Sequence, residues 1–286
     1  MREIQVEAPA KLNLTLDVTG KRADGYHDMR MVMQSVSLCD RLTLRTEPGE
    51  GLALTTDAGF LPVDRSNLAV SAALALREAT GVDWRKLTIE LEKHIPVCAG
   101  TAGGSSDAAA VLRGLNDLLS LGLTRQELAK IGEKVGSDVP YCVMGGTALC
   151  TGRGEVVEPL TALPPCYLVL AKPAFPISTP QLFSELDRTK VRLRPDTEGV
   201  VDALSRGDLT GVGQRLYNVF EAVLPEGKKA QVEELKRLLL EKGALGACMS
   251  GTGPTVFGLF DSREAAQEAA ERARVLTPQV FFTQPV

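Results

Sequence analysis

The chain opens with a regular alternation of apolar and polar residues. In residues 11–18, KLNLTLDV, leucine and valine alternate with polar side chains, and this two-residue period is typical of a β-strand with one buried face. Similar short apolar runs predict further strands at residues 29–37, 41–46, 51–56 and 86–92. Between them a helical pattern covers residues 67–79, with Ser66 placed to cap its start and Gly81 to close its end. The first part of the chain is therefore expected to be mainly sheet.

Two more helical patterns follow a glycine-rich stretch in the middle of the chain. Apolar residues three and four positions apart predict a helix over residues 108–121, and Gly122 lies just past its end. The sequence TRQE at residues 124–127 has the form of a capping box, which predicts a second helix that ends at Gly136. A return strand is then expected at residues 147–155.

A change in composition suggests where one domain ends. Prolines become dense in residues 161–180, so we predict a boundary near residue 160 and two domains, residues 1–160 and 161–286. The second domain is mostly helical up to residue 242 and then has the order strand, strand, helix, strand, which suits a small antiparallel α/β sandwich. These last elements are expected at residues 246–251, 255–260, 263–273 and 279–284. Because β and α elements do not alternate regularly, the predicted fold class is α+β rather than a Rossmann sheet.

Composition narrows the classes of partner and compartment. Of the 286 residues, 44% are hydrophobic, and the formal net charge is −4 without a sustained basic run. This balance argues against nucleic acid or an anionic membrane as the main partner, and it leaves the oligomeric state open. Six cysteines are scattered without a CxxC pair, so we expect neither a disulfide framework nor a structural zinc site, and the expected compartment is the reduced cytoplasm. The start of the chain lacks the apolar core of a signal peptide, and no apolar run reaches the ~18 residues of a membrane span.

Residues 96–110, PVCAGTAGGSSDAAA, are the strongest candidate for a binding site. Small side chains let a ligand approach the backbone closely, and the helix that follows offers unpaired N–H groups and a partial positive charge at its start. A phosphate fits that description, although a tight turn before a capped helix would also explain the small residues. The Gly-Lys-Ser/Thr ending of a P-loop is absent, and so is a GxGxxG dinucleotide fingerprint followed by an acidic residue.

Three motifs in order along the chain resemble those of the GHMP kinase superfamily, which includes galactokinase and the homoserine and mevalonate kinases. They are PAKLNL at residues 9–14, the loop at residues 96–107 and SGTGPTVFG at residues 250–258. The resemblance implies a two-domain fold, with an N-terminal mixed sheet carrying helices and a C-terminal ferredoxin-like α/β sandwich. It also implies binding of ATP with Mg²⁺, without a dedicated metal site in the protein. The ATP-binding residues that it implies are Asn67, Pro96, Val97, Cys98, Ala99, Gly100, Thr101, Ala102, Gly103, Gly104, Ser105 and Ser106.

Within that superfamily, further segments resemble the 4-diphosphocytidyl-2-C-methyl-D-erythritol kinases. These segments are residues 20–29 (GKRADGYHDM), 65–73, 136–155 (beginning GSDVPYC) and 178–183. The resemblance implies transfer of the γ-phosphoryl group of ATP to the C2 hydroxyl of the methylerythritol moiety, in the non-mevalonate synthesis of isoprenoid precursors. It places the cytosine between Tyr26 and Phe183, with a hydrogen bond from His27, and we expect Asn13 to hold the substrate by hydrogen bonding. Two alternatives stay open: another kinase of the superfamily, such as homoserine or mevalonate kinase, and a non-catalytic relative that binds nucleotide.

Lys11 and Asp138 are the candidate catalytic residues. By the resemblance Asp138 is the base that takes the hydroxyl proton, and a lysine near it would keep the carboxylate ionised and stabilise the forming alkoxide. Each residue also has a plainer interpretation, because Asp138 precedes a proline-containing helical turn that it could cap, and a lysine on the polar face of a strand is often solvated. Lys11 and Asn13 lie about 7 Å apart on the same strand face, which favours the functional interpretation.

The residues around the start of the predicted loop helix also have two interpretations. Ser105 and Ser106 would either cap the helix or place a hydroxyl on phosphate or Mg²⁺. A carboxylate is unfavourable beside a triphosphate, so we expect Asp107 to face away and act structurally. The loop departs from the family's usual glycines and leucine at Cys98, Thr101 and Ala102, which leaves the affinity for ATP open.

Overall fold

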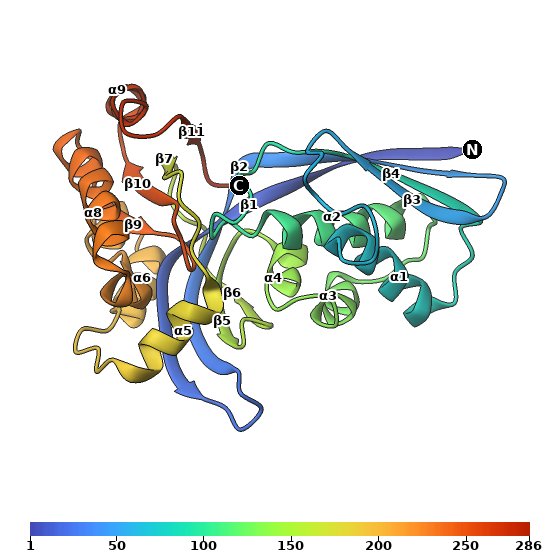
Figure 1. The fold of residues 1–286 in the computed structure, drawn as a ribbon, viewed down its shortest axis with the longest axis horizontal. Helices are drawn as coiled ribbons and strands as arrows, with labels where there is room; N and C mark the ends of the chain where they lie inside the picture. Colours follow the sequence, from blue (N-terminus) through green and yellow to red (C-terminus); the bar gives the residue numbers. More distant parts are fainter.

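Two long paired strands form the spine of the molecule, and the computed structural model describes residues 1–286. Strands β1 (Arg2–Lys21) and β2 (His27–Glu47) run antiparallel through the centre of the molecule (Figure 1). The other strands of the same sheet are β3 (Gly51–Thr56), β4 (Lys86–Glu92), β5 (Thr147–Gly152), β6 (Val156–Pro159) and β8 (Tyr217–Asn218). The order of this seven-stranded mixed sheet is β3-β4-β2-β1-β8, and β5 pairs with both β2 and β6.

The strand predicted from the alternating pattern is present, but both of its faces are covered. On the polar face, Lys11 is 4% exposed, and Asn13 and Thr15 are fully buried. The pairing of β1 with β2 shifts between Pro9 and Lys11 and again between Asn13 and Thr15, and such bulges re-aim side chains. The pattern therefore located the strand correctly, whereas its polar residues face the interior of the molecule instead of water.

Four helices lie on one side of the large sheet (Figure 1), where α2 and α4 contact its strands and α1 and α3 pack on the other helices. They are α1 (Leu68–Thr80), α2 (Gly103–Leu118), α3 (Arg125–Glu133) and α4 (Val139–Met144). The cap of α1 is Asn67, whose Oδ1 accepts a hydrogen bond from the N–H of Ala69 at 3.0 Å, so the prediction of Ser66 was wrong by one residue. The hydroxyl of Ser66 instead donates to Asp64 at 2.6 Å, and Gly81 closes α1 as predicted.

The start of α2 differs most from the prediction. The helix begins at Gly103 rather than at residue 108, and it ends at Leu118. Glycine has a low intrinsic helix propensity, which is why the sequence suggested a longer loop. A Cβ at Gly103 would lie only 3.1 Å from the Ile95 side chain, so close packing decides the residue type here. The predicted capping box at the start of α3 is confirmed, and that helix ends at Glu133.

The C-terminal part forms a second, four-stranded sheet. Its strands are β7 (Tyr167–Lys172), β9 (Gly246–Met249), β10 (Val256–Phe260) and β11 (Gln279–Thr283). They pair antiparallel in the order β11-β7-β10-β9, and α8 (Glu226–Glu241) and α9 (Arg263–Ala273) pack on them. This connectivity is that of a ferredoxin-like sandwich, so the predicted C-terminal architecture is confirmed. The remaining helices are α5 (Thr179–Arg188), α6 (Thr197–Ser205), α7 (Leu209–Gln214) and the 3₁₀ helix η1 (Val219–Val223).

Two short segments from late in the chain join the large sheet. Strand β8 pairs parallel to β1, with Thr15 opposite Tyr217, and Val36 of β2 forms a bridge with Pro285. The division at residue 160 stays a prediction, because these pairings connect the later residues with the first sheet. No helix is both long and apolar enough to cross a membrane.

Candidate active site

One cleft of about 960 Å³ brings the predicted phosphate, catalytic and base-binding residues together. Its wall contains the glycine-rich loop, Lys11 from β1, Asp138 from the segment before α4, and Phe183 from α5. Of all the predicted site residues, only Asn13 and Ser106 lie outside that wall. Segments far apart in the sequence therefore meet around one space.

The loop at residues 96–102 has a strained and closely held backbone. Cys98 and Ala102 have positive φ angles of 52° and 55°, a region that costs residues other than glycine of order 1 kcal/mol each. Gly100 also has a positive φ, and a Cβ there would lie 2.1 Å from the carbonyl oxygen of Ser250. The neighbouring residues therefore fix the shape of the loop.

Three hydrogen bonds tie the middle of this loop to other parts of the site. The Lys11 N–H donates to the Thr101 carbonyl at 3.1 Å. The Ser250 hydroxyl donates to the Gly100 carbonyl at 3.0 Å, and the Thr255 N–H donates to the Ala99 carbonyl at 3.3 Å. All three bonds use loop carbonyls, and the N–H groups of residues 98–105 find no acceptor within the chain. A row of free N–H groups at the start of α2 suits an anion with several oxygens, such as the phosphates of a nucleotide.

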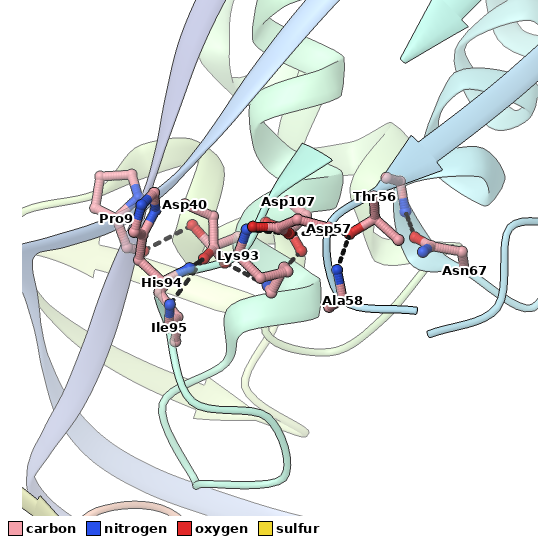
Figure 2. A network of polar contacts seen from close by, with 12 residues as sticks. Pro9, Asp40, Thr56, Asp57, Ala58, Asn67, Lys93, His94, Ile95 and Asp107 are labelled. Carbon is pink, nitrogen blue, oxygen red and sulfur yellow. Dashed lines mark hydrogen bonds and ion pairs between the residues drawn. The ribbon is translucent and has the colours of Figure 1, made fainter. Parts of the chain in front are cut away.

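A buried charge cluster lies beside the start of α2 (Figure 2). The Lys93 ammonium contacts the Asp107 carboxylate at 2.8 Å and also the Asp40 carboxylate. Burial lowers the pKa of Lys93, but the attraction of Asp107 and Asp40 outweighs burial and raises it. Burial also raises the pKa of Asp107, and the like charge of Asp40 adds to that rise, so that it reaches about 7 against the attraction of Lys93. Asp107 was expected to face away from the site, yet it lies in the cleft wall together with Lys93.

Lys11 and Asp138 meet inside the cleft. The Lys11 Nζ lies 3.6 Å from Asp138 Oδ2, and the side chain of Asp138 is 32% exposed. Asp138 directly precedes α4, but its side chain makes no capping hydrogen bond, so the capping interpretation does not hold. Lys11 is buried, so the solvated interpretation does not hold for it either. A carboxylate that is open to the cleft and next to a buried ammonium can accept a proton from a bound hydroxyl.

Asn13 lies behind this pair instead of facing the cleft. It is fully buried, and its Oδ1 accepts a hydrogen bond from Lys11 Nζ at 2.7 Å. Its Nδ2 lies 3.3 Å from the Met31 sulfur, and its N–H donates to the Ser250 hydroxyl at 3.2 Å. In this structure the Asn13 carboxamide holds Lys11 and does not line the cleft, and a hydrogen bond from Asn13 to the substrate stays a prediction.

The predicted base-binding residues line the same cleft. The rings of His27 and Phe183 stack with centroids 4.6 Å apart, and His27 Nε2 lies 2.8 Å from Asp187 Oδ1. Tyr26 is 56% exposed, and the Arg153 guanidinium lies 5.3 Å above its ring. Aromatic faces at an open end of a cleft suit a flat heterocycle. Hydrogen bonds to the Lys21 ammonium and to His27 lower the pKa of the Asp187 carboxyl.

The two predicted serines differ in position, and neither caps α2, which has no side-chain cap. Ser105 lines the cleft, whereas the Ser106 hydroxyl donates to the Pro9 carbonyl at 2.6 Å and is buried. In this structure Ser106 links α2 to β1, and its predicted part in ATP binding stays a prediction. Asn67 does line the cleft, although its carboxamide is engaged with Ala69 and Pro62.

Sequence reasoning missed several residues of the cleft wall. Lys93, Arg153, Asp187 and Thr252 all line it, and none was singled out. Arg153 and Thr252 lie inside segments that carry the family resemblance, so attention to their charged and hydroxyl side chains could have found them. Lys93 and Asp187 gave no signal, because a single charged residue near a strand end or on a helix is usually solvated.

Comparisons with known proteins agree with this geometry. Residues 67–146 match the model for the GHMP kinases N-terminal domain, and residues 200–275 match the model for the GHMP kinases C-terminal domain. A protein of Exiguobacterium sibiricum named 4-diphosphocytidyl-2-C-methyl-D-erythritol kinase is 47% identical over 97% of this chain and 96% of its own length. One of Alkaliphilus metalliredigens with the same name is 41% identical over 99% of this chain and 97% of its own length.

Solved structures give the same result for the fold. A crystal structure of a 4-(cytidine 5'-diphospho)-2C-methyl-D-erythritol kinase has a TM-score of 0.83, with 32% identity and 99% of both chains covered. A homoserine kinase from Cytophaga hutchinsonii has a TM-score of 0.79 at 22% identity, covering 99% of this chain and 95% of its own, which shows a shared fold. The chain thus belongs to the GHMP kinases, in the family of the 4-diphosphocytidyl-2-C-methyl-D-erythritol kinases.

Proposed function

We propose that this kinase transfers the γ-phosphoryl group of ATP to the C2 hydroxyl of 4-diphosphocytidyl-2-C-methyl-D-erythritol. The observation that carries the proposal is that Lys11 and Asp138 lie in the same cleft as the loop with free N–H groups and the rings of Tyr26, His27 and Phe183. Such a substrate has a cytosine at one end and the acceptor hydroxyl at the other. A cleft lined both by aromatic rings and by a carboxylate beside an ammonium offers contacts for both parts of such a substrate.

The catalytic step follows from the charges beside the acceptor site. Asp138 takes the proton of the C2 hydroxyl while the hydroxyl oxygen forms a bond to the γ-phosphorus of ATP. The bond between the γ-phosphorus and the oxygen that bridges to the β-phosphate breaks, and ADP leaves. Lys11 keeps the Asp138 carboxylate ionised and stabilises charge on the attacking oxygen. Asn13 acts behind Lys11, because its Oδ1 holds the ammonium in place at 2.7 Å.

The loop fits the nucleotide phosphates better than it fits a bare metal ion. The free N–H groups of residues 98–105 would bind phosphate oxygens, and no cluster of three or more His, Cys, Asp or Glu side chains is placed to hold a metal. Mg²⁺ would therefore be held mainly by the phosphates, with the Ser105 hydroxyl as a nearby protein oxygen, and would neutralise charge on the phosphoryl group. The cytoplasm remains the expected compartment, and the six free cysteines support it.

A turnover assay with three acceptors tests the proposal. ADP release would be measured with 4-diphosphocytidyl-2-C-methyl-D-erythritol, homoserine and mevalonate at equal concentrations with Mg-ATP. Turnover of the cytidyl compound alone is the expected result. Turnover of homoserine or mevalonate instead would assign the chain to another activity of the same fold, and ATP binding without turnover of any acceptor would favour a non-catalytic role.

A further inference from the structure

Three buried charges hold the two ends of the phosphate loop together (Figure 2). Asp40 comes from β2, Lys93 directly follows β4, and Asp107 is in α2. Their side chains are 0%, 7% and 3% exposed, respectively. We call these three residues the loop clasp. Charges as buried as these are retained only with close partners, because removal from water is costly for each of them.

Asp40 fixes the start of the loop. Its Oδ1 accepts hydrogen bonds from the N–H groups of His94 at 2.6 Å and Ile95 at 2.8 Å. These are the two residues that directly precede Pro96. Because both donors are backbone groups, the path of the chain into the loop depends on one carboxylate of β2.

Lys93 connects that start to the end of the loop. Its Nζ contacts Asp40 Oδ2 and also Asp107 Oδ2, 2.8 Å away, on the helix that leaves the loop. A Cβ placed on Gly103 would lie 3.3 Å from the same Nζ, so the ammonium also packs under the first turn of α2. The segment from residue 96 to residue 102 is therefore a closed ring whose two ends meet at one ammonium group.

The contacts that close this ring are needed because the backbone conformation of the loop is strained. Cys98 and Ala102 both have positive φ angles, and a freed segment would relax toward ordinary conformations. The free N–H groups of residues 98–105 would then no longer be held in place. The Lys93 ammonium already contacts two carboxylates. Its positive charge is therefore compensated and attracts a phosphate only weakly.

We propose that Lys93 is a positioning residue for the nucleotide, which sets the affinity for ATP by neutralising Asp40 and Asp107 where the two ends of the phosphate loop meet. The proposal rests on the proposed placement of ATP at this loop. This role differs from direct binding of phosphate, because a positioning lysine is needed only to balance the charges of the two carboxylates. Removing one of those carboxylates should then make the lysine less necessary.

The test compares Lys93→Met, Asp107→Asn and the double variant Lys93→Met/Asp107→Asn. Lys93→Met leaves the buried carboxyl groups of Asp40 and Asp107 without their shared cation, so we expect KM for ATP to rise at least about tenfold, equivalent to about 1.4 kcal/mol, with KM for the cytidyl substrate nearly unchanged. Asp107→Asn keeps the contact between Lys93 and Asp40 and should change KM for ATP by less than about threefold. The double variant should recover to within about threefold of the native value, because one carboxylate with two backbone donors is tolerated in the interior.

Hydrogen exchange of the loop amides gives a readout that does not depend on turnover. Amides of residues 97–105 should exchange faster in Lys93→Met than in the native chain without ATP, and the double variant should return toward native protection. Lys242→Met, which breaks the contact of Lys242 with Glu268 between α8 and α9, is the matched control and should leave both KM values and loop exchange unchanged. If Lys93→Met does not fold, the pair of Asp107→Asn and the double variant still decides the question.

Two results would overturn the proposal. A double variant as poor in KM for ATP as Lys93→Met would make Lys93 a direct ligand of the phosphates. Loop amides that exchange equally in all variants would show that the loop clasp does not hold the loop. Failure of the proposed ATP placement is a separate result, because Mg-ATP would then protect no loop amide in the native chain while the comparison between variants stays informative.

Discussion

At the scale of single residues, the two oxygens of Asp138 are the most consequential atoms of the site. The carboxylate does not cap α4 and is open to the cleft, so Asp138→Asn should remove only the proton acceptor. We expect kcat to fall by ~10²–10⁴-fold with little change in the affinity for ATP. Steady-state kinetics and the binding of a non-hydrolysable ATP analogue measure the two effects. Asp202→Asn, on the exposed outer face of α6, is the control, and near-normal turnover in Asp138→Asn would remove the base assignment.

We expect Tyr26 to contribute to substrate affinity and not to the chemical step. Its ring is exposed at the open end of the cleft, and stacking of an aromatic ring on a base contributes roughly 1–3 kcal/mol. Tyr26→Ala should therefore raise KM for the cytidyl substrate ~5- to 150-fold, with KM as a proxy for Kd. KM for ATP should change little and serves as the internal control. Free CMP should compete with the substrate, and a lack of competition at millimolar CMP would argue that the cytosine binds elsewhere.

Side-chain neighbours could be predicted where two residues share one face of a predicted strand. The contact between Lys11 and Asn13 follows from their positions on one strand face, and the structure has it at 2.7 Å. The role of Asn13 could not be predicted, because its burial depends on Met31 and on Ser250, more than two hundred residues later. A local period shows which side chains share a face, but it does not show what covers that face.

At the scale of elements, the phosphate loop carries the only exposed cysteine. Burial raises the pKa of the Cys39, Cys142, Cys150, Cys166 and Cys248 thiols, whereas Cys98 is exposed in the cleft wall. Iodoacetamide should therefore label Cys98 first, and Mg-ATP should slow that labelling by covering the loop. Peptide mass spectrometry with and without Mg-ATP measures both effects. Slow labelling of Cys98 that does not respond to ATP would contradict an open loop that binds nucleotide.

The Asp107 carboxyl in α2 should make the free energy of unfolding depend on pH. The pKa of Asp107 is raised to about 7, mainly by burial, while an unfolded aspartate titrates near 4. Between these values the native state binds a proton that the unfolded state lacks, so the free energy of unfolding decreases as pH rises from about 4 to about 7. Asp107→Asn should remove this slope and be more stable than the native chain at pH 8, by on the order of 1–3 kcal/mol. Urea unfolding at pH 5, 6, 7 and 8 measures the difference, and equal slopes in both proteins would contradict the raised pKa.

Elements with strong local signals could be predicted closely, and elements decided by packing could not. The capping box of α3 is a purely local arrangement, and it is present as expected. The start of α2 was predicted too late, because its first residues are glycines whose helical state depends on Ile95 and Lys93 nearby. Propensity describes the isolated chain, whereas the buried charges beside Gly103 act only in the folded one.

At the scale of the whole molecule, sequence order was enough to predict the C-terminal sandwich. The predicted order of strand, strand, helix and strand after residue 242 matches β9, β10, α9 and β11. Strand β7, which lies between β11 and β10 in the sheet, falls in a part of the chain that was expected to be mostly helical. The pairing of β8 with β1 could not be predicted, because a two-residue strand has no detectable period. The same holds for the contact of residues 284–286 with β2, where the Val286 N–H donates to the Ser35 carbonyl at 3.0 Å.

Those late pairings have a consequence for how the protein is made. A ribosome adds about 5–20 residues per second, and some 250 residues separate Ser35 from Val286, so β2 leaves the exit tunnel tens of seconds before its last partner is synthesised. During that interval the inner strands of the large sheet lack β8, and Asn13 lacks the Ser250 hydroxyl to which its N–H donates. We expect the nascent chain to depend on chaperones in this window, since unpaired strands and exposed apolar surface favour aggregation. Asn13, which holds the proposed catalytic lysine, is translated 237 residues before its partner Ser250, so the surroundings of Lys11 are completed late in synthesis.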